Sequence, residues 1–372
     1  MILLNRRVII ILLSSLFVFN PSILSFAGWA NKASMIIEDN IDHISFSADG
    51  KKILFDRQKG SGPQMINVYN LETHELAYYQ SPPDETWKMA RYSPDGKHIV
   101  FSIGTPHIET IDYPGAESRF KKRQIAIMEP DGKNLREFGD PKRGGDYPTF
   151  SHSGKTVIYE KGSVTRVNGR IISSLTGGDF YELDINTGKE TRLTWFYIFT
   201  LLSPPFEFPD GKTLVFSEFG TNRNSSEFIQ NDNSYLVKKG DKKLPYPFFV
   251  PDNRYSFLIS KTLNTRGPLV SKDGKHVYFW TNAQKPDRIH GEGDQIFEYS
   301  KEGKHRRLTY LPVSTIYSDD LSPDGQYLAV IFDPLSKGPV TKKIAICNII
   351  TGSYKEINLP DKPSRIINQN QK

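Results

Sequence analysis

The sequence has almost no cysteine, since Cys347 is the only one among 372 residues. A single thiol cannot form an internal disulfide bond, so no cross-link of this kind holds the chain together. Cys347 lies between Ile346 and Asn348 on an apolar stretch. We therefore expect a buried, unreactive thiol and not a nucleophile.

A strong excess of charge of one sign is also missing. The chain has 48 lysines and arginines against 42 aspartates and glutamates, a net charge of +6. Its basic clusters, at residues 121–123, 238–243 and 304–307, are spread along the chain, where such residues discourage unwanted pairing of sheet edges. Without a concentrated basic stripe, nucleic acid is not an expected partner. Anionic glycans and lipid headgroups stay open as ligands.

Sequence motifs for catalysis are absent. Two Gly-Lys pairs end like phosphate-binding loops, but Thr149 and Phe206 stand where that motif requires glycine. No Gly-x-Ser-x-Gly elbow occurs, and none of the eight histidines has the spacing of a zinc-binding helix. We expect no cofactor and no metal, and the sequence leans away from enzymatic activity.

The one long apolar run lies near the N-terminus. Residues 8–19 follow two arginines and are too few to cross a bilayer, which takes roughly 20 apolar residues. Small residues of a cleavage site follow at 25–27, and this order is typical of a secretory signal peptide, with an uncleaved membrane anchor as the alternative. We expect residues 1–27 to be removed and residues 28–372 to be secreted, or periplasmic if the source has an outer membrane.

What the chain has in abundance is one short phrase, typified by Ser-Pro-Asp-Gly. Five copies and a looser sixth occur, at residues 46–50, 92–96, 150–154, 270–274, 321–325 and 209–211. Their glycines lie 46 to 63 residues apart, close to the roughly 40–50 residues of a four-stranded propeller blade with added loops. Proline sets φ for the second turn position and glycine accepts the positive φ that closes the turn. Because glycine is kept in every copy while the other residues vary, the phrase indicates a backbone requirement and not a catalytic one. The aspartates are expected to cap their own turns.

Each turn is followed by a strand with apolar residues at consecutive positions, as in Ile99–Phe101. A strand with one face in water would alternate, so these strands are expected to be covered on both faces. A third and a fourth strand follow, clearest at residues 180–183 and 191–194. Four strands in each of six units predict an all-β protein, a six-bladed β-propeller that forms a single domain over residues 28–372.

The fourth repeat departs from the pattern. Glu207 stands where the other first strands have an aromatic or aliphatic residue. Residues 249–259 mimic a further turn and strand, but only 21 positions separate Asn253 from the next turn glycine, Gly274, too few for a full blade. Seven blades therefore stay open as an alternative at residues 220–264.

The phrase Ser-Pro-Asp-Gly-Lys, the apolar strand, an Ile-rich strand and an Arg-Leu-Thr ending together resemble the WD40-like (PD40) propeller repeat of the TolB family. The resemblance covers about residues 40–360. TolB proteins have an α/β domain ahead of the propeller, whereas here the first repeat begins almost directly after the leader, so we expect no such domain. The resemblance also implies a possible lyase, because some TolB-like propellers resemble pectate-fragment lyases with a histidine-bound metal in the central channel. This sequence shows no such cluster of His, Gln or Glu.

The loops of a four-stranded blade fall on two opposite faces of a propeller. The first and third turns share one face. The second turn and the connection to the next blade share the other, which we call the long-loop face, and here it holds residues 104–122, 161–178, 220–233, 282–294 and 333–342. Variable loops on a rigid scaffold are where binding usually resides. The candidate ligand-binding residues on this face are Tyr113, Arg119, Arg166, Arg170, Arg223, Asn224, Arg288 and His290.

The arginines suit an acidic ligand, because the guanidinium group binds a carboxylate through two parallel hydrogen bonds. We predict a monomeric, non-enzymatic propeller that binds a protein partner in the cell envelope through the long-loop face. One alternative is a lyase or hydrolase acting on acidic oligosaccharides. Another is a module that binds glycan or the envelope surface, and exposed aromatic residues such as Trp195, Trp280 and Tyr113 beside arginines would support it. Burial of the tryptophans between blades would remove that support.

Overall fold

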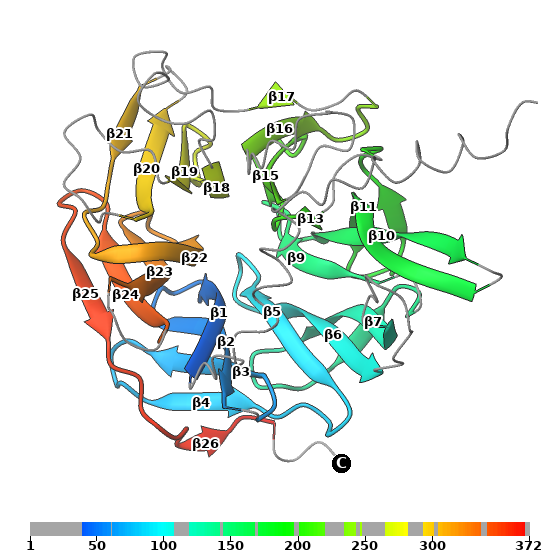
Figure 1. Cartoon of the computed structure of the whole chain (residues 1–372), viewed down its shortest axis with the longest axis horizontal. Helices are drawn as coiled ribbons and strands as arrows, with labels where there is room; N and C mark the ends of the chain where they lie inside the picture. Colours follow the sequence, from blue (N-terminus) through cyan, green and yellow to red (C-terminus); the bar gives the residue numbers. More distant parts are fainter. Residues whose placement is uncertain are drawn as a thin grey trace, which may run out of the picture.

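The computed structural model describes residues 39–60, 62–107, 119–141, 144–167, 170–196, 201–219, 234–242, 246–247, 265–281, 293–300, 304–335 and 341–368. These residues form six small sheets arranged as a ring around a central channel (Figure 1). The predicted six-bladed, all-β propeller is confirmed. The proposed leader, residues 1–27, and the hairpin-like segment at 249–259 lie outside the described residues. In the described ranges no helix is long and apolar enough to cross a membrane.

The strands of a blade follow one another in sequence and pair antiparallel, with the first strand innermost (Figure 1). Blade 1 consists of β1 (Asp39–Phe46), β2 (Lys52–Lys59), β3 (Met65–Asn70) and β4 (Leu76–Tyr79). Blade 2 consists of β5 (Thr86–Tyr92), β6 (Ile99–His107), β7 (Arg119–Met128) and β8 (Arg136–Phe138). Blade 3 consists of β9 (Asp146–Phe150), β10 (Thr156–Val167), β11 (Arg170–Asp184) and β12 (Glu190–Arg192). Blade 4 consists of β13 (Leu201–Leu202), β14 (Phe206–Glu207), β15 (Thr213–Phe219), β16 (Ser234–Lys238) and β17 (Tyr246–Pro247). Blade 5 consists of β18 (Thr265–Val270), β19 (His276–Thr281), β20 (Gln295–Ser300) and β21 (His305–Arg307). Blade 6 consists of β22 (Val313–Leu321), β23 (Tyr327–Pro334), β24 (Lys343–Asn348) and β25 (Tyr354–Ile357). Blade 4 is irregular because two short strands, β13 and β14, both pair with β15.

The repeated phrase is a hydrogen-bonded turn between the first and second strands of a blade. In blade 2, Ser93 Oγ donates to Asp95 Oδ1 (2.7 Å) and accepts from the backbone N–H of His98 (2.9 Å). The N–H of Lys97 also donates to Asp95 Oδ1 (3.1 Å), and Gly96 has a φ of +72°. The same bonds recur in blades 1, 5 and 6. The expected capping role of the turn aspartates is confirmed.

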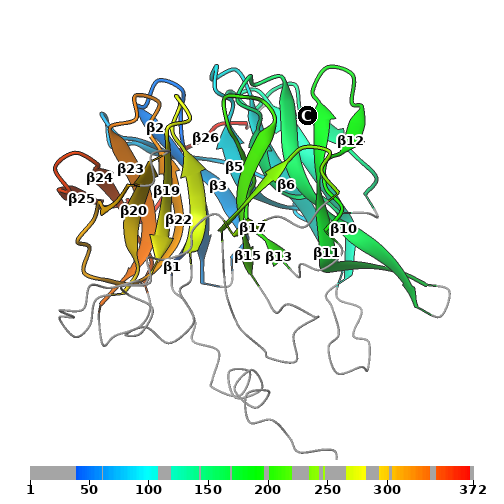
Figure 2. The ribbon, with the colours of Figure 1, turned by 90° about the horizontal axis from the view of Figure 1, so that it is seen from above.

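Neighbouring turns also touch around the ring. A methyl group added to Gly154 would lie 3.4 Å from Pro94 of the preceding blade, and one added to Gly274 would lie 2.8 Å from Pro209. Both glycines have a positive φ, and Gly274 is also required by the close approach of Pro209, whereas the 3.4 Å at Gly154 is an ordinary contact. Similar approaches pair Gly50 with Pro323 and Gly96 with Ala48. Figure 2 shows these turns, in blue and cyan for blades 1 and 2, projecting at one end of the ring.

The hydrophobic core consists of separate clusters, each between two adjacent blades. Ile99, Val100 and Phe101 are fully buried at consecutive positions, as expected for a strand covered on both faces. Cys347 is fully buried in the cluster between blades 5 and 6, and burial raises the pKa of its thiol to about 12. The prediction that this thiol is buried is confirmed.

The ring is joined by contacts between blade 6, the segment that follows it, and blade 1. The short strand β26 (Arg365–Ile366) pairs parallel with β4 and gives blade 1 a fifth strand (Figure 1). The sequence had predicted only four strands for this blade. Before it, the carbonyl of Pro360 accepts a hydrogen bond from Arg57 (2.9 Å). On the inner side, the N–H of Phe46 donates to Asp320 Oδ2 (2.7 Å). We call this blade 6 to blade 1 junction the seam.

Candidate functional site

Most of the candidate ligand-binding residues named from the sequence lie outside the described residues, namely Tyr113, Arg223, Asn224, Arg288 and His290. The other three lie on strands whose backbone is described. Arg119 begins β7 and pairs with His107 of β6. Arg166 and Arg170 lie at the end of the hairpin formed by β10 and β11, where Val167 pairs with Arg170 (Figure 2). The structure thus brings Arg166 and Arg170 together on one hairpin.

The central channel contains a repeated backbone irregularity. In blades 1, 2, 3 and 5 the innermost strand has a register shift, and the residue four positions before the turn serine has a positive φ. These residues are His43 (+47°), Met89 (+60°), Tyr147 (+51°) and Gly267 (+56°). A left-handed backbone costs a residue other than glycine about 1–2 kcal/mol. Such strain concentrates at functional sites, where the surroundings enforce it.

Three of these residues, His43, Met89 and Tyr147, belong to one network, and a buried carboxylate joins the first two. Asp56 on β2 is fully buried, and its Oδ2 accepts the N–H of Met89 (2.7 Å) and lies 3.0 Å from His43 Nδ1. Burial raises the pKa of Asp56, and the hydrogen bond from His43 opposes this effect. The Tyr147 ring lies 5.9 Å from the His43 ring. The backbone N–H of Tyr147 donates to Met89 Sδ (3.4 Å). Blades 1, 2 and 3 therefore meet in a single polar network.

Lys88, next to Met89 on β5, is half-buried beside this network. Burial and the nearby Arg123 guanidinium lower the pKa of Lys88 to about 8, although the charges of Asp56 and Asp42 act in the opposite direction. Neighbouring cations have carboxylate partners: Arg123 pairs with Asp146, and Lys342 with Asp42 (2.6 Å). Among the described residues, no hydrogen bond or ion pair engages the ammonium group of Lys88.

Arg91 lies across the channel closer to the turns. Its Nη1 is 3.3 Å from Asp320 Oδ1 of blade 6, and its guanidinium carbon is 4.7 Å from the centre of the Phe206 ring of blade 4. On the turn side of Arg91 is a cavity of about 300 Å³ lined by all six blades. Because β5 runs toward its turn, Lys88 and the His43 network lie on the other side of Arg91, toward the long-loop face.

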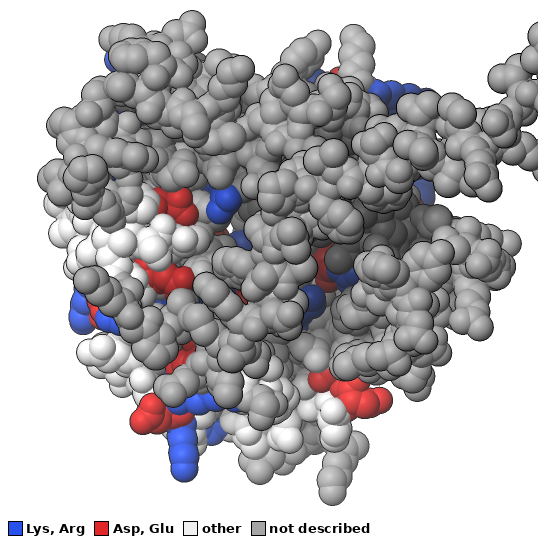
Figure 3. Space-filling model, in the orientation of Figure 1, with Lys and Arg blue, Asp and Glu red and all other residues white. Residues whose placement is uncertain are grey.

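Charges of both signs surround the centre of the ring. In Figure 3, which has the orientation of Figure 1, acidic and basic side chains of the described residues are interspersed near the axis. The described part of this face shows no large patch of one sign.

Comparison with known proteins gives the fold. No family model matches the sequence, and no curated protein matches it. Among solved structures, a putative TolB from Agrobacterium tumefaciens is 19% identical with a TM-score of 0.52, over 80% of this chain and 91% of that one. TolB from Acinetobacter baumannii is 15% identical with a TM-score of 0.53, over 92% of this chain and 69% of that one. The fold is that of a TolB-like β-propeller. An oligogalacturonate lyase in complex with manganese is 13% identical, with a TM-score of 0.53, over 87% of this chain and 79% of that one.

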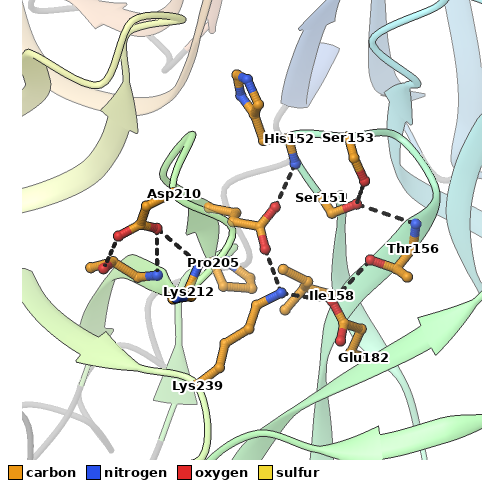
Figure 4. A network of polar contacts seen from close by, with 12 residues as sticks. Ser151, His152, Ser153, Thr156, Ile158, Glu182, Pro205, Asp210, Lys212 and Lys239 are labelled. Atoms are coloured by element: carbon orange, nitrogen blue, oxygen red, sulfur yellow. Dashed lines mark hydrogen bonds and ion pairs between the residues drawn. The ribbon is translucent and has the colours of Figure 1, made fainter.

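Glu207, the irregular residue of the fourth repeat, has a structural role in this TolB-like propeller. Its side chain is buried, accepts the N–H of His152 (2.7 Å) and forms an ion pair with Lys239 (Figure 4). Lys239 also donates to Glu182 Oε1 (2.7 Å). Burial opposes the charge on Lys239, but the hydrogen bonds that its ammonium group donates to both carboxylates raise its pKa. Glu207 thus fastens blade 4 to blade 3.

A metal-binding cluster would favour a lyase, and exposed tryptophans would favour a glycan-binding module, but the described residues give little support to either. No group of three or more His, Cys, Asp or Glu side chains comes close enough there to hold a metal ion. Trp280 is buried and packs against Arg266, with 5.4 Å from the guanidinium carbon to the ring centre. Trp195 is half-buried beside Arg192 and Lys242. The glycan hypothesis therefore loses Trp280 as an exposed platform on the TolB-like propeller.

Sequence reasoning missed the channel residues of the TolB-like propeller, although part of the signal was present. If the repeat copies are aligned on their turn serines, Arg91 and Asp320 both stand two positions before the serine. Charged side chains at the same position of the innermost strand must meet near the axis. Nothing local to His43 or Lys88 indicates the contacts that they make across blades.

Proposed function

We propose that this chain is a non-enzymatic binding protein of the cell envelope, which recognises an acidic segment of a protein partner through the long-loop face. The observation that carries the proposal is Lys88, a half-buried cation in the channel that has no carboxylate partner among the described residues. A carboxylate from a partner would form a charge-assisted hydrogen bond there, shielded from water.

The surroundings of Lys88 support a prearranged site. The neighbouring Met89 is held by Asp56, and Asp56 also contacts His43, so the strand that carries Lys88 is tied to blade 1. A rigid site loses little conformational entropy on binding. On the long-loop face, Arg166 and Arg170 lie on one hairpin and would add further contacts for acidic side chains.

The envelope location rests on the leader at residues 1–27, whose order is that of a signal peptide. The first test is therefore export: the mature chain should begin near residue 28 and be found outside the cytoplasm. An uncleaved chain in the cytoplasm would contradict this part of the proposal.

Partner capture tests the site. Crosslinking of the mature protein in its native envelope, followed by identification of the captured protein, should give a partner with the intact chain and much less of it with Lys88→Ala. Lys97→Ala is the matched control, because Lys97 is an exposed lysine in a turn at the opposite end of the ring. With the purified partner, Lys88→Ala should weaken binding by about tenfold or more, since a charge-assisted hydrogen bond contributes about 1.5–3 kcal/mol. Equal capture by both variants would contradict the role of Lys88.

A second candidate function is a lyase for acidic oligosaccharides, favoured by the pair formed by His43 and Asp56. A carboxylate that orients an imidazole is the arrangement of a general base, and Tyr147 lies beside it. The solved lyase holds manganese, but the described residues of this chain offer no comparable set of ligands, so no step is assigned to a metal. Incubation with oligogalacturonate should then yield unsaturated products that His43→Ala abolishes. No product with the intact chain would leave binding as the function.

A further inference from the structure

The seam contains a groove that neither function uses. It lies on the outer side of the junction between blades 6 and 1, has a volume of about 710 Å³, and is lined by residues of β25, the turn after β3 and the segment 358–360. Pockets of a few hundred to about 1,000 Å³ are the size that holds small ligands. Apolar residues such as Ile346 and Ile357 form its floor, continuous with the core between the two blades.

One wall of the groove contains a residue that the repeat does not explain. Blades 1, 3 and 6 have the same turn after their third strand, in which the N–H of the fifth residue donates to the carbonyl of the first at 2.9 Å. In blades 3 and 6 the fifth residue is glycine, Gly188 or Gly352, each with a φ of +72°. In blade 1 it is His74, with a φ of +63°. The turn favours glycine, so a histidine at this left-handed position points to a role for its side chain.

The His74 ring is held in a fixed orientation. Its Nδ1 lies 2.9 Å from the hydroxyl of Tyr69, which is itself buried at the base of the groove. The two rings are 6.1 Å apart. With Nδ1 engaged, Nε2 remains to donate to or accept from a ligand, and no described residue hydrogen-bonds to it.

The opposite wall offers aromatic surface and neutral hydrogen-bonding groups. Tyr327 and Tyr354 are 38% and 40% exposed, although both are large aromatic residues. Asn348 and Asn358 also line the groove, and Asn348 offers its amide N–H groups, because its Oδ1 accepts the backbone N–H groups of Ile350 and Thr351. The carboxylate of Glu356 is paired with Lys343 (2.7 Å), so the groove does not present an unpaired acid, and its other charged lining residue, Lys355, is exposed to solvent.

These groups define a ligand with two kinds of surface. Half-exposed tyrosine rings pack against apolar C–H groups while their hydroxyls stay wet. Amides and an imidazole donate and accept at fixed angles, which suits adjacent hydroxyl groups. A pyranose ring combines an apolar C–H face with a rim of hydroxyls. We propose that the seam groove binds a neutral saccharide, with Tyr327 and Tyr354 as its aromatic contacts and His74 as a hydrogen-bonding partner.

The test uses the full mature chain and three defined probes: cellobiose, maltose and N,N′-diacetylchitobiose. Saturation-transfer NMR and titration calorimetry should detect binding of at least one probe. Tyr327→Ala should weaken that binding by about tenfold or more, the factor expected on removing one aromatic contact. Tyr310→Ala is the matched control, because Tyr310 is a more exposed tyrosine (62%) that does not line the groove, and it should bind as the intact chain does.

His74→Gly separates binding from folding. Glycine suits the φ of this turn, so the variant should be at least as resistant to thermal unfolding as the intact chain, yet it should lose most of the saccharide binding. Failure of all three probes to bind, or unchanged binding by both His74→Gly and Tyr327→Ala, overturns the proposal. Capture of the protein partner should be unaffected by either variant, so this outcome is independent of the long-loop face.

Discussion

Glu160 should make the folded protein less stable as the pH rises from 5 to 7.5. It lies on β10 with only 2% of its surface exposed, packed so closely on Gly178 that a methyl group there would clash with its carboxyl oxygen. Burial raises the pKa of Glu160 from 4.5 to about 8, although the Arg123 guanidinium opposes the shift.

The direction of this change in stability follows from the number of protons that the folded and unfolded states bind. The folded protein keeps the Glu160 proton up to about pH 8, whereas the unfolded chain releases it near pH 4.5. Between these values the unfolded state binds fewer protons, so stability is fully present below pH 4.5 and falls as the pH rises. One pKa unit corresponds to about 1.4 kcal/mol, so the loss between pH 5 and 7.5 is on the order of 2–3 kcal/mol.

Glu160→Gln isolates this effect, because glutamine keeps the shape and carries no proton to lose. The free energy of unfolding should be measured in urea at pH 5 and at pH 7.5 for both proteins. The difference between them should shift by roughly 2–3 kcal/mol in favour of the variant at the higher pH. Glu75→Gln, at an exposed position on blade 1, controls for the loss of one charge. A difference that is the same at both pH values would refute the reasoning.

Three further predictions concern a turn contact, a buried carboxylate and the buried thiol. Gly274→Ala should lower the free energy of unfolding by about 1–3 kcal/mol more than Gly325→Ala, because both have a positive φ but only the first would meet a neighbour, Pro209, at 2.8 Å; equal losses in urea denaturation would show that the contact is unimportant. Glu207→Ala should cost about 1–3 kcal/mol by thermal denaturation, since it removes the acceptor of the His152 N–H and one of the two carboxylate partners of the largely buried Lys239, and a loss below about 0.5 kcal/mol would contradict the role given to it. Cys347 should resist iodoacetamide in the native protein and react after unfolding, because it is fully buried with its pKa raised to about 12; rapid native labelling would contradict this.

The fold could be predicted because the same turn and the strand after it occur six times in the sequence. The turn serines, aspartates and glycines act within five residues of one another, so their roles are visible locally. The network of Asp56, His43 and Met89 could not be predicted, because it depends on which residues of different blades meet after the ring has formed. Strand β26 was missed for the same reason: its two ladder residues pair with β4, which lies 288 residues earlier, and no pattern in the segment indicates that partner.

The seam has a consequence for how the molecule folds and opens. Most blade contacts join residues that are close in sequence, but the contacts at the seam join residues 274 to 303 positions apart. Long-range contacts form slowly, because the chain must lose much conformational freedom before they are made. Ring closure should therefore be the late step of folding, and hydrogen exchange should report opening there first. A saccharide bound in the groove would touch both blades and stabilise only the closed ring, so ligand concentration would set how often the propeller opens.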